Sequence, residues 1–310
     1  MSTDTRPPFK ETEASRPSFD ASLSSSFSKS QAPDVDWKPG QGTNDTHEAP
    51  SKYHYKIIVP GKTEIGPMDM YKLMLGGISP RPVALVTTKS KEGQLNLCPV
   101  SWYQMLSHNP PLVMLSFGGD QGRRKDSEVN IEATGEFTIS SASEPYAEAL
   151  NYSSIDAPHG TSEYALTGLT PVASRLVSPP RVKEAPFSME CKLDFRREYY
   201  ADGSGVSSLT HEAANGQGKG GLTTVIVVAR VVVLHVREDC LNEDGSVNMA
   251  QMLPLTRVSG MLYTRTTHGF ELVRPKWDEV KDTPEVQAAL KREVTVVPPD
   301  FEDPILLSYP

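Results

Sequence analysis

The sequence has little cysteine, and its cysteines form no metal-binding or disulfide pattern. Cys98, Cys191 and Cys240 are odd in number, far apart and never arranged as CxxC. Neither a disulfide framework nor a metal site is expected, and a reducing, cytoplasmic compartment fits this usage. No apolar run approaches the roughly 20 residues that a membrane-spanning helix needs. The chain begins with polar residues and lacks the apolar segment of a secretory signal.

An excess of positive charge is also missing. The formal net charge is −8, from 39 acidic and 31 basic residues. A chain with this balance has no general positive field to hold nucleic acid, so small molecules or proteins are the expected partners. The first fifty residues carry eight acidic side chains, which argues against a mitochondrial presequence.

Apolar side chains are scattered singly in residues 1–50. Twenty of these fifty positions are Ser, Thr or Pro. Such a segment cannot bury enough apolar surface to offset the entropy lost on ordering. We therefore expect residues 1–50 to be a disordered tail. Residues 51–310 are expected to form one domain.

Beyond the tail, short apolar strands alternate with a few helices. Helical spacing predicts helices at 67–75, 127–134 and 143–150, the first stopped by Gly76 and Gly77 and the last capped by Ser143. Alternating or β-branched runs predict strands at 81–88, 94–100, 112–117, 136–141, 189–199 and 222–236. A turn at 91–93 joins the first two strands, and the Gly-rich stretch 203–221 is expected to be a flexible hairpin insertion. Short strands at hairpin spacing favour a closed antiparallel barrel over a parallel sheet.

The most informative stretch is a Gly-rich basic turn at 118–127. It follows the strand 112–117 and leads into the helix 127–134. Its cations are Arg123, Arg124 and Lys125, and Ser127 places a hydroxyl where the helix begins. The free N–H groups and the dipole of a helix start attract anions, of which phosphate is the usual one. The alternative is a solvated basic turn in which Asp126 or Ser127 is an ordinary helix cap.

Motifs on both sides of this turn occur in a recognisable order. They lie at 79–88, 93–103, 109–117, 125–131, 135–137, 149–153, 157–160, 163–171, 190–193 and 260–263. In this order they resemble the flavin reductase-like family, which includes flavoredoxins and the small reductase components of two-component monooxygenases. The resemblance covers roughly residues 65–275, which it implies to be the core of the domain 51–310. The resemblance implies a mainly β, antiparallel Greek-key fold, the FMN-binding split β-barrel, with a few short helices. It also implies FMN, or FAD, as cofactor.

The activity implied by the resemblance is that of an oxidoreductase. Hydride from NADH or NADPH would reach the flavin, and electrons would pass to free flavin, a monooxygenase or another acceptor. No GxGxxG motif follows a strand, so the nicotinamide is not expected in a Rossmann site. Relatives usually form homodimers, and the run 222–236 is more apolar than one side of a monomeric barrel requires. The alternatives are a non-catalytic flavin-binding or electron-transfer protein of the same fold, and an interaction protein with a phosphorylated tail.

The resemblance further implies which residues bind the flavin. The ring would lie against the backbone of one segment and an aromatic wall, and the phosphate would lie at the helix start. The ring segment is Pro99, Val100, Ser101 and Trp102; the phosphate residues are Arg124, Lys125 and Ser127; and Ser116 is expected near the ribityl phosphate. Alternatively, Trp102 and Tyr103 are core or dimer-interface aromatics, and Ser116 contacts only its neighbours.

Arg81 and His159 are the candidate catalytic residues. Arg81 would stabilise negative charge on the reduced ring, or else form a surface ion pair. His159 lies in a loop that borders the reactive face in the family and would accompany NAD(P)H or the acceptor, unless it is idle in solvent. Asn96 is either a hydrogen-bonding partner near the flavin or a bulge, and Tyr263 is either near the flavin or a core tyrosine. Cys98 is expected to serve packing.

Overall fold

The computed structural model describes residues 9–23, 26–43, 56–60, 65–119, 124–201, 205–208 and 221–296. They belong to two compact units. The first unit comprises Met1–Phe27 and Ser79–Thr267 and contains the barrel strands. The second comprises Ser28–Ile78 and His268–Pro310.

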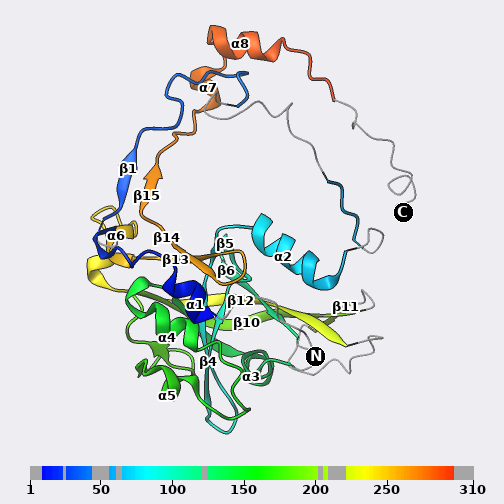
Figure 1. The fold of residues 1–310 in the computed structure, drawn as a ribbon. Helices are drawn as coiled ribbons and strands as arrows, with labels where there is room; N and C mark the ends of the chain where they lie inside the picture. Colours follow the sequence, from blue (N-terminus) through cyan, green and yellow to red (C-terminus); the bar gives the residue numbers. More distant parts are fainter. Residues whose placement is uncertain are drawn as a thin grey trace. The chain divides into compact units, whose positions relative to one another are not determined.

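An eight-stranded sheet forms the centre of the first unit (Figure 1). Its order is β4-β3-β7-β10-β12-β6-β5, with β11 paired to β10, and all neighbours are antiparallel. The bounds are β3 Ala84–Lys89, β4 Leu95–Val100, β5 Tyr103–His108, β6 Pro111–Gly118, β7 Glu136–Ser141, β10 Phe187–Tyr200, β11 Gly205–Ser208 and β12 Leu222–Val236. The predicted mainly β, antiparallel fold is confirmed. The long β-branched run is one strand with the predicted bounds.

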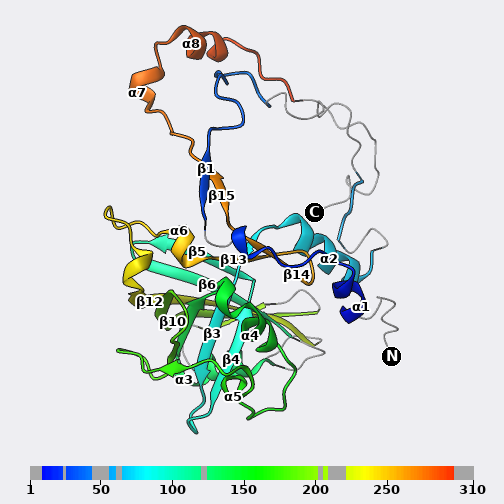
Figure 2. The same cartoon turned by 60° about the vertical axis from the view of Figure 1, so that its left-hand side comes forward.

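Strand β3 is buried on both faces. Since successive side chains of a strand point to opposite sides, its residues alternate between two apolar clusters. Ala84 and Val86 belong to one apolar cluster, which also contains Phe137 of β7. Leu85 belongs to a second cluster, on the face that is covered by Leu150 and Tyr164. These two residues lie in the helices α4 (Ala147–Tyr152) and α5 (Glu163–Thr167). In Figure 2 both helices lie beside β3 and β4.

The strand predicted at 81–88 is divided in two. Its first part, β2 (Arg81–Pro82), pairs with β13 (Leu255–Val258), and β13 pairs with β14 (Leu262–Arg265). Its second part is β3 of the large sheet. Between them, the carbonyl of Val83 accepts a hydrogen bond from the N–H of Ala142. Arg81 is therefore part of a small three-stranded sheet.

Two helix starts differ from the prediction. The helix α3 (Asp126–Thr134) begins with Lys125 at the N-cap and has no side-chain cap, so neither Asp126 nor Ser127 caps it. Ser143 precedes a short 3-10 helix, η3 (Glu144–Tyr146), which leads into α4, and its hydroxyl donates to the Met252 carbonyl instead of capping. The remaining elements of this unit are α1 Phe9–Ala14, η1 Ala21–Leu23, β8 Pro171–Val172, β9 Arg181–Val182, η4 Glu238–Cys240 and α6 Met249–Met252.

The second unit contains the helix predicted near residue 67. This helix, α2 (Pro67–Gly77), continues through both glycines that were expected to stop it, and Ile78 is its C-cap. The other elements are β1 Ser28–Ser30, β15 His268–Phe270, α7 Trp277–Val280 and α8 Pro284–Leu290, and β1 pairs with β15 in parallel. The predicted disorder of residues 1–50 stays a prediction, and 1–8, 24–25 and 44–50 lie outside the described residues. Of the predicted insertion 203–221, only 205–208 and 221 are described.

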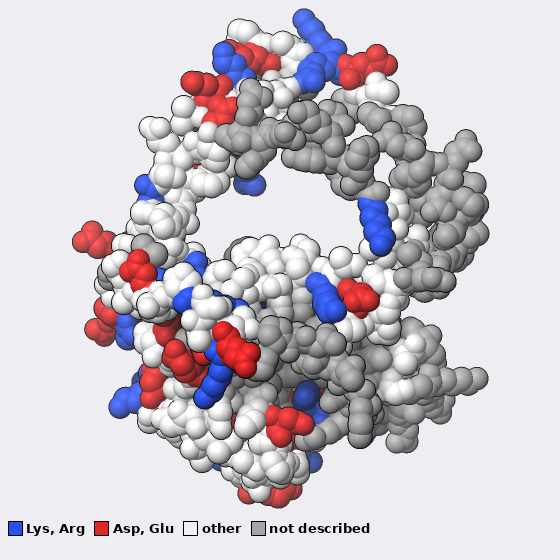
Figure 3. Space-filling model, viewed as in Figure 1, with Lys and Arg blue, Asp and Glu red and all other residues white. Residues whose placement is uncertain are grey.

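Within the described ranges, the helices are all too short or too polar to cross a bilayer. On the face of the first unit drawn in Figure 3, the described lysines and arginines lie among aspartates and glutamates. Positive and negative side chains are thus interspersed on this face.

Candidate functional site

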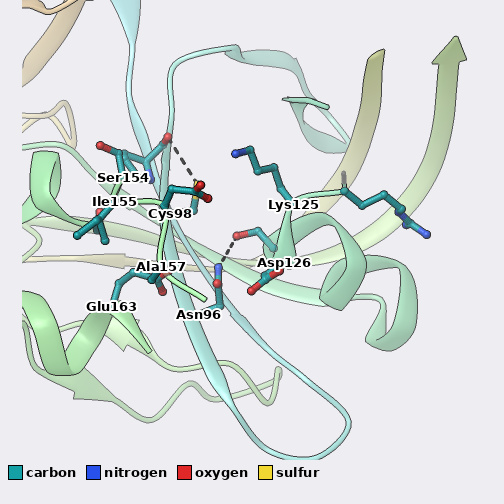
Figure 4. Close-up of a pocket in the computed structure, with 13 residues that line it drawn as sticks. Asn96, Cys98, Lys125, Asp126, Ser154, Ile155, Ala157 and Glu163 are labelled. Atoms are coloured by element: carbon teal, nitrogen blue, oxygen red, sulfur yellow. Dashed lines mark hydrogen bonds between the residues drawn. The ribbon is translucent and has the colours of Figure 1, made fainter. Parts of the chain in front are cut away.

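A cavity of about 240 Å³ lies where β4 faces the start of α3. Four segments line it: Asn96, Cys98 and Pro99 of β4; Arg124, Lys125, Asp126 and Ser127 at the start of α3; the loop Ser153, Ser154, Ile155, Asp156 and Ala157; and Glu163 of α5. Figure 4 shows Lys125 extending from the helix start toward the side of the cavity that carries Ser154. Five predicted site residues, Asn96, Pro99, Arg124, Lys125 and Ser127, thus meet at one cavity.

Close backbone packing precedes the helix start. A Cβ on Gly119 would lie 2.5 Å from the carbonyl oxygen of Leu222, so only glycine fits there. The N–H of Gly119 donates to the Thr223 carbonyl at 2.7 Å, which holds the end of β6 against β12. Residues 120–123 of the predicted basic turn, with Arg123, lie outside the described residues.

The start of α3 has backbone N–H groups available for an anion. The first helical hydrogen bond runs from Val129 N–H to Lys125 O at 3.0 Å, and no side chain caps the helix. The N–H groups of the first turn have no partner within their own helix, and the helix dipole adds positive potential there. The Lys125 side chain is exposed and forms no ion pair within the described part of the chain. This end of the cavity is suited to a phosphate.

Two buried amide side chains join α3 to the neighbouring strands. Asn96 Nδ2 donates to Ser127 Oγ at 2.6 Å, and Asn130 Nδ2 donates to Thr88 Oγ1 at 3.0 Å. Asn96 pairs with Thr88 in regular β3–β4 register, so it marks no bulge. Ser127 acts as acceptor in its bond, which leaves its own proton to be donated. The helix start is therefore fixed relative to β4.

A buried ionic cluster lies behind this helix start. Glu128, 1% exposed, accepts hydrogen bonds from Arg124 Nε at 2.7 Å and from Arg124 Nη2 at 2.6 Å. Arg196 of β10, 4% exposed, donates to the same carboxylate through Nε at 3.0 Å and Nη2 at 2.7 Å. Two more carboxylates complete the cluster, since Glu132 pairs with both arginines and Glu198 pairs with Arg196.

The cluster fixes the charge of its arginines. Burial opposes the charged form of Arg124, but the hydrogen bonds that Arg124 donates to Glu128 and Glu132 outweigh it and raise the pKa of Arg124. Burial likewise opposes the charge of Glu198, and hydrogen bonds from Tyr200 and Arg196 still lower its pKa. We did not expect this cluster. The spacing of residues 124, 128 and 132 shows its helical part, but nothing in the sequence near Arg196 identifies the partner on β10.

Two titratable groups on the wall of the cavity opposite α3 have raised pKa values. Burial raises the pKa of Cys98 to about 11, which keeps the thiol protonated and agrees with a packing role. Burial also raises the pKa of Glu163, although its carboxylate accepts a hydrogen bond from the Leu97 N–H at 2.8 Å. Neither Glu163 nor the loop 153–157 was predicted as part of the site, because polar residues of a loop or of a helix start carry no distinctive pattern by themselves.

His159 lies beside the cavity and contacts the helix start. Its Nδ1 is 3.0 Å from Asp126 Oδ2, and its side chain is 71% exposed. His159 and Asp126 also line a small adjoining pocket with Gly160. The predicted loop histidine is therefore close to α3, with its ring open to solvent.

The ring segment beyond Pro99 lies outside the residues that line the cavity. Val100 is buried in the barrel core. Ser101 and Trp102 lie between β4 and β5, and the Trp102 carbonyl accepts a hydrogen bond from the N–H of Ser116 at 2.9 Å. Tyr103 packs against the core, and burial raises its pKa to about 12. The role of this segment in binding the flavin ring therefore stays a prediction.

Arg81 and Tyr263 belong to the small sheet and do not line the cavity. Arg81 is buried, so the alternative of a surface ion pair is wrong, and its Nη2 donates to the Ser259 carbonyl at 3.2 Å. The Tyr263 hydroxyl donates to Asn151 Oδ1 at 3.3 Å, and its ring stacks under Arg257. No group of three His, Cys, Asp or Glu side chains suited to a metal exists among the described residues.

Comparison with known proteins identifies the family. A sequence model of the flavin reductase like domain matches residues 75–266. The chain belongs to the flavin reductase-like family. It is 32% identical over 213 residues to the uncharacterised protein YwrF of Bacillus subtilis, which covers 68% of this chain and 96% of that protein. The predicted resemblance is thereby confirmed, and membership supports a flavin-related oxidoreductase.

Solved structures agree. Nitrilotriacetate monooxygenase component B from Bacillus cereus is 33% identical, with a TM-score of 0.61 over 71% of this chain and 100% of that chain. The Pseudomonas fluorescens 2-nitrobenzoate 2-nitroreductase NbaA is 25% identical, with a TM-score of 0.56 over 75% and 98%. A Shewanella frigidimarina protein with a split barrel domain, 21% identical at a TM-score of 0.54 over 69% and 94%, shows the same fold. The fold is the predicted split barrel.

Proposed function

We propose that this protein is an FMN-dependent oxidoreductase that takes hydride from NAD(P)H and passes electrons to free flavin or another acceptor. The observation that carries the proposal is the cavity between β4 and the uncapped start of α3, in a chain of the flavin reductase-like family. The residues of this cavity fit a flavin phosphate at one end. Bound flavin would supply the ability to accept hydride and to release electrons.

Lys125 and Ser127 hold the phosphate in this proposal. Lys125 contributes a positive charge that no described carboxylate compensates, and the first-turn N–H groups of α3 add donors. Ser127 donates its hydroxyl proton, since its oxygen already accepts from Asn96. Charge-assisted hydrogen bonds of this kind are about twice as strong as neutral ones. Arg124 lines the same end and adds positive charge, although two carboxylates share it.

Pro99 provides the wall for the ring, and the backbone of Val100, Ser101 and Trp102 continues that wall. Pro99 lines the cavity and offers a flat apolar surface without an N–H group. The other three residues follow directly along the chain. Their role as ring contacts is part of the proposal, as is that of Ser116, whose N–H binds the Trp102 carbonyl.

Arg81, His159 and Tyr263 complete the proposed site. Arg81 lies in the small sheet, three residues before β3, and its guanidinium would oppose negative charge on a reduced ring. His159 stands beside the cavity with an exposed ring that a nicotinamide or an acceptor can reach. Tyr263 lies near the loop that lines the cavity, through its bond to Asn151.

The proposed acceptor is a monooxygenase component or a small oxidant. The support comes from two relatives that are named as a monooxygenase component B and as a nitroreductase.

A homodimer is also proposed, because Met105 and Leu106 are exposed apolar side chains on β5, at the end of the sheet order. Three free cysteines support a cytoplasmic location.

The deciding test is an anaerobic reduction assay. The purified protein, reconstituted with FMN, is mixed with NADH or NADPH without oxygen, and the visible flavin absorbance is followed. We expect the absorbance to bleach at a rate that increases with nucleotide concentration. If FMN binds and stays oxidised with both nucleotides, the non-catalytic flavin-binding alternative replaces this proposal.

A further inference from the structure

We propose that Arg196 is a positioning residue for the flavin phosphate. Through Glu128 it holds the first turn of α3 to β10 and compensates a buried carboxylate behind the anion site. This inference rests on the proposed function. Arg196 does not line the cavity and is 4% exposed, so it acts through Glu128 and not by touching the ligand.

The geometry of Glu128 makes it a rigid link. Its Oε1 accepts from both arginines and its Oε2 accepts from Arg124 Nε, so the carboxylate has a fixed orientation. Glu128 lies one residue after Ser127 and three after Lys125, in the same helical turn. A shift of Arg196 would therefore move the residues that bind the phosphate.

The charges of the cluster add a second effect. Three carboxylates, Glu128, Glu132 and Glu198, face two arginines. Without Arg196, only Arg124 would remain to compensate all three, directly behind the helix start. Buried charges interact strongly because they are poorly screened, so the uncompensated carboxylates would oppose a phosphate. Displacement and repulsion both weaken phosphate binding and leave the ring contacts of the cavity unchanged.

Riboflavin separates this role from a general loss of structure, because it carries the same ring without the phosphate. The experiment measures the Kd of FMN and of riboflavin by fluorescence titration for wild type and Arg196→Met. We expect FMN binding to weaken about tenfold, the range for residues coupled in one ionic network, and riboflavin binding to change less than about twofold. Arg230→Met is the matched control, since Arg230 pairs with Asp194 across β12 and β10 on the exposed surface.

Two further variants keep the test decisive if Arg196→Met folds poorly. Glu128→Gln with Arg196→Met removes one negative and one positive charge together, so the net charge of the cluster does not change. Arg196→Lys keeps the charge but loses the fork that binds Glu128 at two points, so a smaller loss of FMN selectivity is expected. Equal weakening of FMN and riboflavin in all variants would overturn the positioning role.

The same data distinguish this inference from the proposed function. A wild type that binds riboflavin as tightly as FMN has no phosphate site, and both proposals fail. A wild type that prefers FMN, together with an Arg196→Met variant that keeps this preference, overturns the positioning role alone. Loss of the preference in Arg196→Met but not in Arg230→Met establishes it.

Discussion

Two neighbouring cations at the start of α3 have different surroundings. The guanidinium of Arg124 is shared by Glu128 and Glu132, whose hydrogen bonds raise its pKa against the effect of burial. The ammonium group of Lys125 is exposed and forms no ion pair with the described residues. A cation that is already paired gains less from a new anion than one that is not. Lys125 is therefore the residue on which phosphate affinity should depend most.

Replacing Lys125 and Ser127 together by alanine should weaken FMN binding by about 2–4 kcal/mol. The estimate follows from charge-assisted hydrogen bonds of about 1.5–3 kcal/mol each, lost together. Fluorescence titration of FMN measures the change. Lys91→Ala, at an exposed turn position, is the control and should bind FMN as wild type does. An unchanged FMN affinity in the double variant would show that the phosphate lies elsewhere.

At the scale of elements, the hydrogen bonds Asn96–Ser127 and Asn130–Thr88 connect α3 to the β3–β4 hairpin and set the shape of the site. The sequence predicted β4 and α3 within one residue at each end, because alternation and helical spacing are local signals, but it missed the division of the strand 81–88 into β2 and β3. It misplaced the helix cap, since Asp126 Oδ2 contacts His159 and Ser127 Oγ accepts from Asn96. Both partners are about thirty residues away along the chain. Such tertiary contacts override local capping preferences and cannot be read from the helix alone.

The hydrogen bond from Asn130 to Thr88, which connects α3 to β3, should contribute measurably to the free energy of unfolding. Both residues are buried, and Asn130→Ala leaves the Thr88 hydroxyl without this donor. An unsatisfied buried polar group costs about 1–3 kcal/mol. Urea unfolding should show a loss of that size in the free energy of unfolding. The double variant Asn130→Ala with Thr88→Val should recover part of it, and no recovery would assign the loss to packing instead.

At the scale of the whole molecule, the residues that could be predicted were those with local signals. Pro99, the proposed ring wall, and Lys125 and Ser127, the proposed anion site, come from short motifs, and all three line one cavity. Arg196 reaches the same site from a strand seventy residues later. Its importance depends on the β10–β7–β3 strand order, which a single sequence does not specify. The interior of the barrel, where titratable groups are buried, is likewise visible only in the structure.

The barrel should lose stability at alkaline pH. Burial raises the pKa of Cys98 to about 11, and those of Tyr103 and Tyr164 to about 12, so each folded pKa exceeds its usual value. The unfolded chain then releases these protons first, which favours unfolding as pH rises from about 9 toward 12. Below pH 9 the effect is absent. Thermal melts at several pH values should show this fall in stability. The fall should be smaller in Tyr164→Phe and as large as in wild type in the exposed-site control Tyr152→Phe.

The N-terminal segment should contribute little to the stability of the first unit. Within this unit, Phe19 stacks against the Arg265 guanidinium at 3.7 Å, and Arg265 Nη1 donates to the Asp20 carbonyl at 2.8 Å. Phe19 is 66% exposed, and Arg265 also pairs with Glu144 at 2.8 Å, so it keeps a partner without the segment. Exposed cation–π contacts contribute about 0.5–1 kcal/mol, and a hydrogen bond about as much.

Deleting residues 1–27 should therefore lower the free energy of unfolding by about 1–2 kcal/mol, the sum of one exposed cation–π contact and one hydrogen bond. FMN affinity should be unchanged, because the described residues of this segment, 9–23 and 26–27, do not line the cavity beside α3. Thermal melts and FMN titration of the shortened chain measure both quantities. Arg265→Met in the full-length chain removes the same two contacts together with the ion pair to Glu144, so its loss of stability should be at least as large. A much larger loss on deletion would mean that the segment packs as part of the barrel. The prediction of a disordered tail at residues 1–50 would then be wrong for residues 1–27.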